Sequence, residues 1–277
     1  MARLRGRRIV VALLVVLVLA GLALAALWGL QRQLIYFPDA SDVPPAGEVL
    51  PGARDVTLET TDGLELGAWY LPADAARDTG MAVLMAPGNG GNRAGRTGLA
   101  GKLADRGFAV LVIDYRGYGG NPGSPSEEGL AADADAAVRA MEDLGHPLDR
   151  TIFFGESLGT GVVAGLQERH RPAGIVLRSP FTSLADVGRH HYPWLPVRML
   201  LRDRFPVLGP LAASDVPVTV IYGDRDSVVP TELSARVADG APSLVERVVL
   251  SGADHNDPAM FGSRVADAVD RLAREVG

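Results

Sequence analysis

The amino-acid sequence predicts an α/β protein in which a mostly parallel, doubly wound sheet carries helices on both faces. The main observation is a series of short apolar segments, a pattern typical of strands that are buried on both faces. Those segments are residues 82–86, 108–113, 151–154, 174–177, 218–222 and 245–250. Helical periodicity lies between most of them, for example over residues 131–144 and 158–168. Because parallel neighbours need a crossover connection, this alternation predicts a parallel sheet.

A hairpin and an insertion modify the alternation. Residues 56–58 and 64–66 alternate polar and apolar side chains about Asp62-Gly63, which is a strong signal for an antiparallel hairpin. Residues 180–215 instead carry several prolines and large apolar side chains. We interpret them as a short lid over the carboxyl edge of the sheet; a long surface loop with one packing helix is the alternative.

Length and composition limit the class of protein. About 245 residues follow an N-terminal apolar segment, so the predicted domain, residues 53–277, leaves little room for a second one. The net charge of −6 and the pI near 5.4, without a basic stripe, argue against nucleic-acid binding. The sequence has no cysteine, which excludes disulfides, thiolate metal sites and a cysteine nucleophile. It indicates no metal and no organic cofactor.

The N-terminal region is predicted to be a membrane anchor, followed by a proline-rich linker at residues 31–52. Residues 9–30 contain no charged side chain, and as a helix they span about 33 Å, enough to cross a bilayer. Basic residues precede this segment in a short tail, residues 1–8, at Arg3, Arg5, Arg7 and Arg8. Since only Arg32 follows closely, the positive-inside rule places the N-terminus in the cytoplasm and the domain outside it. A cleaved signal peptide, with its cleavage site near residues 23–25, is the alternative.

A serine motif lies where a predicted strand meets a predicted helix. The pentapeptide Gly155-Glu156-Ser157-Leu158-Gly159 directly follows an apolar segment. A nucleophilic serine in this setting projects from a sharp strand-to-helix turn. Gly155 and Gly159 lack Cβ atoms and so let the strand and the helix approach closely. The pentapeptide alone is a weak signal, and a glycine-rich turn is the alternative interpretation.

Asp226 and His255 complete a candidate catalytic group. Each comes shortly after an apolar segment in the last third of the chain. Ligands bind beyond the carboxyl ends of parallel strands, so we expect both residues at the same edge of the sheet as Ser157. There His255 would accept the serine proton, while Asp226 would orient the imidazole and stabilise its charged form. Asp224 competes with Asp226 for the acid role.

Backbone donors for an acyl oxyanion are also predicted. One is the amide of Leu158, at the start of the predicted helix. The second is expected from the glycine-rich loop at residues 87–92, after the first buried strand. Pro87 has no N–H group, so Asn89 is the preferred donor and Gly88 the second candidate. The loop lacks the lysine and hydroxyl pair of a P-loop, which argues against phosphate binding.

With these residues the chain resembles the membrane-anchored α/β-hydrolase-domain family, a branch that includes eukaryotic protein depalmitoylases and bacterial hydrolases. The resemblance covers nearly the whole chain. It rests on residues 34–38, 69–72, 87–92, 114–119, 125–129, the serine motif, 180–184, Asp226 with 229–230, and His255-Asn256. It implies an α/β-hydrolase fold and a triad of Ser157, Asp226 and His255, in the chain order of that family. Pro87 departs from the pattern, because the family usually has histidine there.

The motifs and the resemblance together predict a serine hydrolase that cleaves carboxylic acyl esters or thioesters through an acyl-enzyme. A short apolar lid beside a membrane anchor favours a small-molecule or lipid acyl substrate. A serine aminopeptidase is the enzymatic alternative, and it would need a carboxylate, for which Asp203 in the lid is the candidate. A hydrolase fold reused as a binding module is the non-enzymatic alternative.

Other titratable residues are given structural interpretations. Residues 114–116, Asp-Tyr-Arg, are interpreted as a turn in which the arginine pairs with nearby acids. His146 and His170 lie near predicted helix ends, where capping is the ordinary explanation. His190 and His191 fall in the predicted lid.

Overall fold

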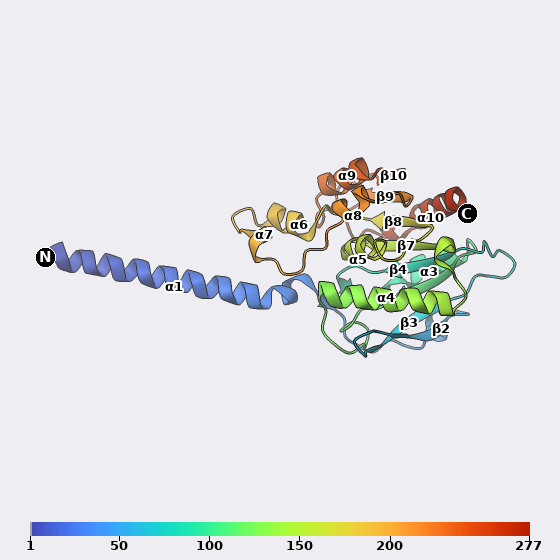
Figure 1. The fold of residues 1–277 in the computed structure, drawn as a ribbon, viewed down its shortest axis with the longest axis horizontal. Coiled ribbons are helices and arrows are strands. Elements are labelled where there is room, and N and C mark those ends of the chain that lie inside the picture. Colours follow the sequence, from blue (N-terminus) through green and yellow to red (C-terminus); the bar gives the residue numbers. More distant parts are fainter. Residues whose placement is uncertain (1) are drawn as a thin grey trace.

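A long N-terminal helix and a domain make up the computed structural model, which describes residues 2–277. Helix α1 (Ala2–Ile35) extends away from the domain (Figure 1). Its apolar stretch is not buried inside the structure, and it is long and apolar enough to cross a membrane. This is the apolar helix that the sequence predicts, and it continues beyond the uncharged segment.

One eight-stranded sheet forms the centre of the domain, in the order β10-β9-β8-β7-β4-β6-β3-β2. In chain order its strands are β2 (Arg54–Glu59), β3 (Glu65–Leu71), β4 (Ala82–Ala86), β6 (Ala109–Ile113), β7 (Thr151–Glu156), β8 (Gly174–Arg178), β9 (Val218–Gly223) and β10 (Leu244–Leu250). The pairs β2–β3 and β3–β6 are antiparallel, and the other pairs are parallel. The predicted α/β class and the predicted hairpin are therefore confirmed.

Helices cover both faces of this sheet. The helices of the domain are α2 (Ala46–Val49), α3 (Thr97–Ala104), α4 (Glu127–Asp143), α5 (Leu158–Leu166), α6 (Leu184–His191), α7 (Val197–Leu200), α8 (Leu208–Ala212), α9 (Thr231–Gly240) and α10 (Ser263–Val276). Three short 3-10 turns are η1 (Arg93–Arg96), η2 (Leu148–Arg150) and η3 (Pro258–Phe261). Helices α4, α5 and α9 share one hydrophobic layer with the sheet, and α3 and α10 share the other.

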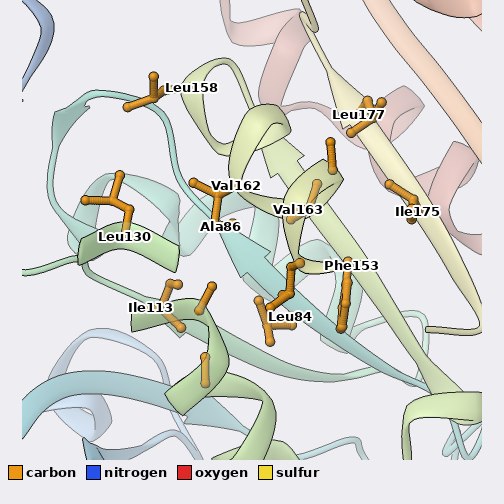
Figure 2. Packing of buried hydrophobic residues seen from close by; sticks show 14 of the residues in the cluster. Leu84, Ala86, Ile113, Leu130, Phe153, Leu158, Val162, Val163, Ile175 and Leu177 are labelled. Carbon is orange, nitrogen blue, oxygen red and sulfur yellow. The ribbon is translucent and has the colours of Figure 1, made fainter. Parts of the chain in front are cut away.

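Alternating side chains of the strands supply these two layers. In β4, Leu84 belongs to the layer with α4 and α5, whereas Val83 and Met85 belong to the layer with α3 and α10. Figure 2 shows the first layer, where Leu84 and Phe153 lie beside Val163 of α5. Burial on both faces explains why the inner parallel strands read as apolar runs, and it holds their carboxyl ends rigidly at one edge. The edge strand β10 differs from the expectation: Val245 and Val249 are exposed, so only one of its faces is covered.

The residues expected to form a linker are ordered against the domain. Helix α1 continues to Ile35, and β1 (Phe37–Pro38) pairs in parallel with β5 (Gly90–Gly91). Tyr36 between them is buried, and its ring packs edge-on against Phe205 with centroids 6.4 Å apart. Backbone pairing and this aromatic contact hold the start of the predicted linker against the domain.

Residues 180–215 break the strand–helix alternation, as expected. They form α6, α7 and α8, and α6 and α7 lie on the side of the domain from which α1 extends (Figure 1). The side-chain amide of Gln31 in α1 donates to the carbonyl oxygen of Leu200 (3.2 Å) and accepts from the N–H of Arg202 (2.7 Å). These bonds join the end of α1 to the segment that follows α7.

Candidate active site

Ser157 joins β7 to α5 in a strained turn. Its φ of +49° lies in the left-handed region that non-glycine residues rarely adopt. A Cβ on Gly155 would lie 2.6 Å from the carbonyl oxygen of Gly159, and a Cβ on Gly159 would lie 2.2 Å from that of Ala86. The two glycines are therefore required by packing, as the sequence motif predicts.

The three residues predicted at the strand ends form one hydrogen-bonded chain. His255 Nε2 lies 3.1 Å from Ser157 Oγ, and His255 Nδ1 lies 2.7 Å from Asp226 Oδ2. All three residues are almost fully buried. Because a carboxylate only accepts hydrogen bonds, a neutral imidazole here carries its proton on Nδ1. Its Nε2 is then left to accept a proton from the serine hydroxyl.

Asp226, rather than Asp224, faces the imidazole. The second carboxylate oxygen of Asp226 accepts from the backbone N–H groups of Val228 (3.0 Å) and Val229 (2.7 Å). Burial by itself raises the pKa of Asp226, but the bond to His255 and the backbone donors outweigh burial and lower it. The Asp224 carboxylate instead accepts a backbone N–H from the turn after β10, at 2.6 Å. The geometry thus separates two acids that the sequence left in competition.

A buried charge network, which sequence analysis missed, lies beneath the turn. Arg178 at the end of β8 donates to the carbonyl oxygen of His255 (3.0 Å) and pairs with Glu156 (2.9 Å). Glu156 also pairs with Arg96 at 2.8 Å. Burial raises the pKa of Glu156, but Arg178 and Arg96 outweigh burial and hold that pKa at about 2. Two features of the sequence could have indicated this network: Arg178 ends an apolar segment, and Glu156 lies inside the serine motif.

Asp254 joins the loops that carry the acid and the histidine. Its carboxylate accepts from the N–H (2.7 Å) and the hydroxyl (2.9 Å) of Ser227, one residue after Asp226. The same carboxylate accepts the backbone N–H of His255 at 2.7 Å. The backbone around the imidazole is thereby fixed to the backbone around its carboxylate partner. Only its position next to His255 pointed to Asp254 in the sequence.

Asn89 lines the same cavity as Ser157 and Leu158. Its side-chain amide donates to the carbonyl oxygen of Ile35 at 2.7 Å. Its own carbonyl oxygen accepts from the N–H of Phe37 at 2.8 Å. These two bonds hold the loop to the end of α1.

The loop before Asn89 is braced through backbone atoms. The hydroxyl of Tyr115 donates to the carbonyl oxygen of Pro87 at 3.0 Å. A Cβ on Gly88 would lie 3.1 Å from Glu156 Oε1 and 3.4 Å from the Cβ of Ser157, so the loop backbone passes directly over the serine turn. The loop therefore keeps its place without the histidine that is usual in the family.

The turn at residues 114–116 is structural, as predicted. Arg116 pairs with Asp62 and with Asp133, each at 2.7 Å. Asp114 pairs with Arg93 at 2.8 Å, and burial raises the pKa of Asp114 to about 6 although Arg93 opposes this. The buried charges of Asp114 and Asp133 therefore each have an arginine partner, without which their burial would be strongly unfavourable.

The side chains of His146 and His170 make contacts other than the expected helix caps. His146 Nε2 lies 2.7 Å from the hydroxyl of Tyr70, and His170 Nε2 lies 3.0 Å from a carboxylate oxygen of Asp135. His191, in α6, lies 2.9 Å from a backbone carbonyl oxygen of the loop after β9 and lines the cavity over Ser157.

An apolar cavity of about 560 Å³ opens above Ser157. Its walls come from the end of α1, from α6 and α7 with their connection, and from the loop after β9. This volume lies in the usual range for small-molecule sites. A buried hydroxyl hydrogen-bonded to an imidazole, at the inner end of an apolar space, suits attack on a carbonyl carbon that carries an apolar group.

Comparison with known proteins places the chain in a family. A family model described as "Serine aminopeptidase, S33" matches residues 78–210. An uncharacterised protein of Mycobacterium tuberculosis is 48% identical over 275 residues, which cover 98% of this chain and 96% of that protein. The chain belongs to the α/β-hydrolase family. The expected family membership is therefore confirmed.

Other relatives of this α/β hydrolase are more distant. The Danio rerio protein named lysophosphatidylserine lipase ABHD12 is 26% identical over 279 residues, which cover 85% of this chain and 72% of that protein. Among solved structures, the Pyrococcus furiosus esterase Pf2001 has a TM-score of 0.68 at 21% identity, covering 87% of this chain and 97% of the esterase. That likeness shows a shared α/β-hydrolase fold.

Replacing Glu156 tests the buried charge network. We expect Glu156→Gln to lower the free energy of unfolding at pH 7 by about 3–5 kcal/mol, because it leaves Arg178 without its buried partner. The folded pKa of Glu156 is depressed to about 2 from the usual 4.5, so its stabilisation is complete above pH 4.5 and is lost as the pH falls towards 2. The difference between wild type and variant should therefore narrow below pH 4.5. Thermal unfolding followed by near-UV circular dichroism at pH 3–7 measures it.

Glu246→Gln is the matched control, since Glu246 forms an exposed pair with Arg271. Its effect should stay below about 1 kcal/mol at every pH. Equal effects of the two substitutions at pH 7 would contradict a special role for the buried pair.

Proposed function

We propose that this α/β hydrolase is a membrane-anchored serine hydrolase that cleaves carboxylic acyl esters or thioesters through an acyl-enzyme. The observation that carries the proposal is the series of hydrogen bonds from Asp226 through His255 to Ser157. Ser157, at one end of this series, lines an apolar cavity. A hydroxyl alone is a poor nucleophile, and this chain supplies the base and the group that orients it.

The acylation step follows from the geometry. As Ser157 Oγ attacks the carbonyl carbon, its proton moves to His255 Nε2 over the existing 3.1 Å contact. Asp226, ionised and bonded to Nδ1, stabilises the imidazolium that forms. The backbone N–H groups of Leu158 and Asn89 are the proposed donors to the oxyanion.

Collapse of the tetrahedral intermediate completes the cycle. The bond to the leaving oxygen or sulfur breaks, and His255 gives its proton to that atom, which departs as an alcohol or thiol. Water then attacks the acyl-enzyme, and His255 removes one proton from the water. As the bond from the acyl group to Ser157 Oγ breaks and the carboxylic acid leaves, His255 passes this proton to Ser157 Oγ. His255 thus passes on each proton that it accepts, so the cycle needs no cofactor.

An acyl substrate is favoured over a peptide. The residues that line the cavity within the described chain include no acid to hold a substrate's amino terminus. Asp203 is bound instead to Arg32 (2.9 Å) and to the hydroxyl of Tyr36 (3.0 Å). Asp186, a second lid acid that sequence analysis overlooked, is paired with Arg198 at 2.8 Å. The description of the family model keeps peptidase activity as the alternative, and the name of the Danio rerio relative supports a lipid ester.

Labelling with a fluorophosphonate probe tests the catalytic proposal. We expect covalent labelling of the wild-type protein in membranes and complete loss of labelling in Ser157→Ala, because the probe reacts only with an activated serine. Ser251→Ala, in an exposed turn, is the control and should label as wild type does. A wild-type protein that stays unlabelled while another serine hydrolase reacts would contradict the proposal, and the non-catalytic binding module would then be favoured. Faster cleavage of aminoacyl anilides than of p-nitrophenyl esters would favour the peptidase.

A matched pair of substitutions tests the acid. Asp226→Asn should lower kcat about 10³–10⁴-fold, because an amide no longer stabilises the imidazolium or fixes its tautomer. Asp224→Asn should leave activity close to wild type, because an amide oxygen still accepts the backbone N–H that Asp224 binds. Steady-state hydrolysis of a p-nitrophenyl ester measures both. Greater loss in Asp224→Asn would reverse the assignment.

The proposal also places the N-terminus in the cytoplasm and the domain outside it. The four arginines before the apolar helix support this orientation. We expect protease added to intact spheroplasts to degrade the domain while a cytoplasmic marker survives. Protection of the domain that is lost only on lysis would contradict the orientation. Carbonate extraction and the mass of the membrane-bound chain separate an uncleaved anchor from a cleaved signal peptide.

A further inference from the structure

The N-terminal helix forms one wall of the cavity over Ser157. Leu27, Gln31 and Leu34 line the cavity, and their spacing of i, i+4 and i+7 places them on one face of α1. Side chains of α6 and α7 line the opposite wall, including Val187. The space that leads to the nucleophile therefore lies between the apolar helix and the lid.

Polar contacts hold these two walls together. Arg32 and the hydroxyl of Tyr36 both bind the carboxylate of Asp203, at 2.9 Å and 3.0 Å. Next to Arg32 in α1, the buried side chain of Gln31 binds backbone atoms on either side of Leu201. These contacts join the end of α1 and Tyr36 to residues 200–203, at and just after the end of α7, so the cavity has a fixed base where the helix meets the domain.

The position of the wall along α1 corresponds to a membrane surface. The helix rises about 29 Å between Ile9 and Trp28, which matches the hydrocarbon thickness of a bilayer. Trp28 is half exposed, and the guanidinium of Arg202 lies 5.0 Å from the centre of its ring. Tryptophan and arginine together are typical of the boundary between lipid and water. The cavity wall therefore begins at the level where α1 would leave the bilayer.

The lid exposes large apolar side chains at the same end of the molecule, two of which, Tyr192 and Trp194, also line the cavity. Tyr192, Trp194 and Met199 are 55%, 77% and 85% exposed. They lie in and around the connection between α6 and α7, on the side from which α1 extends (Figure 1). Large side chains exposed together mark a contact surface, and continuity with an apolar helix identifies lipid as what they contact.

We infer that the lid rests in the leaflet where α1 leaves the bilayer, and that the substrate is a long-chain lipid ester resident in that leaflet. Its acyl chain passes between α1 and the lid into the cavity, so that the anchor is itself part of the acyl-binding site. The ester carbonyl then reaches Ser157 without the chain crossing water. This inference rests on the proposed function and names its substrate class.

A matched pair of substitutions in α1 tests the acyl-binding wall. Leu34→Trp fills part of the cavity, whereas Leu30→Trp changes a leucine of similar exposure (50% against 60%) that does not line it. The full chain is assayed in phosphatidylcholine vesicles with p-nitrophenyl palmitate and p-nitrophenyl butyrate. In Leu34→Trp the ratio of the two kcat/KM values, palmitate over butyrate, should fall about tenfold or more, and in Leu30→Trp it should not change. An unchanged ratio in Leu34→Trp overturns the inference.

Tryptophan fluorescence tests the position of the lid. Trp28→Phe leaves Trp194 exposed and Trp69 buried in the domain. In vesicles that contain phosphatidylcholine brominated at carbons 6 and 7, the fluorescence of this variant should be quenched. Quenching should disappear when Trp194→Phe is added. Equal fluorescence in brominated and plain vesicles would place the lid away from lipid and overturn the inference.

Fluorophosphonate labelling in the same vesicles tests the proposed hydrolase activity independently of the acyl-binding wall. If the protein is labelled but the palmitate-to-butyrate ratio of kcat/KM is unchanged in Leu34→Trp, the acyl-binding wall alone is contradicted. If the protein is labelled but Trp194 is not quenched, the position of the lid in the leaflet alone is contradicted. Unlabelled wild-type protein contradicts the proposed hydrolase, and the inference fails with it.

Discussion

The buried ion pair between Glu156 and Arg178 is the interaction on which the site depends. It joins the ends of β7 and β8 directly beneath Ser157, and the same arginine binds the carbonyl oxygen of His255. A buried charge without a partner is strongly unfavourable, so neither member can change alone. The separation between Ser157 and His255 is therefore maintained from behind the site, by a contact that takes no part in the proposed reaction.

Close backbone packing adds the second constraint. The left-handed conformation of Ser157 is unfavourable in isolation, and it persists because the strand, the helix and the loop after β4 are packed around it. Gly88 passes over the turn, and the Asn89 side chain fixes the same loop to the end of α1. One loop thus touches Ser157 on one side and the apolar helix on the other.

In the proposed function, the loop after β4 connects the polar site at the edge of the sheet to the apolar helix α1. The sheet supplies a rigid polar edge, while α1 and the lid supply an apolar space in front of it. Gln31 and Asp203 tie those apolar walls to each other. A carbonyl group at the inner end would meet the backbone donors and the imidazole, and its acyl chain would remain among apolar side chains throughout.

The sequence by itself determined the features that depend on local pattern. Continuous apolar runs predicted the strands, Asp62-Gly63 predicted the hairpin, and the glycines around Ser157 predicted the serine turn, because side-chain periodicity and the absence of a Cβ act over a few residues. Only the tertiary structure separated Asp226 from Asp224, ordered the expected linker, and joined Glu156, Arg178 and Arg96. Those outcomes depend on which backbone donors, strands and charges come together from distant parts of the chain, and burial decides their energies.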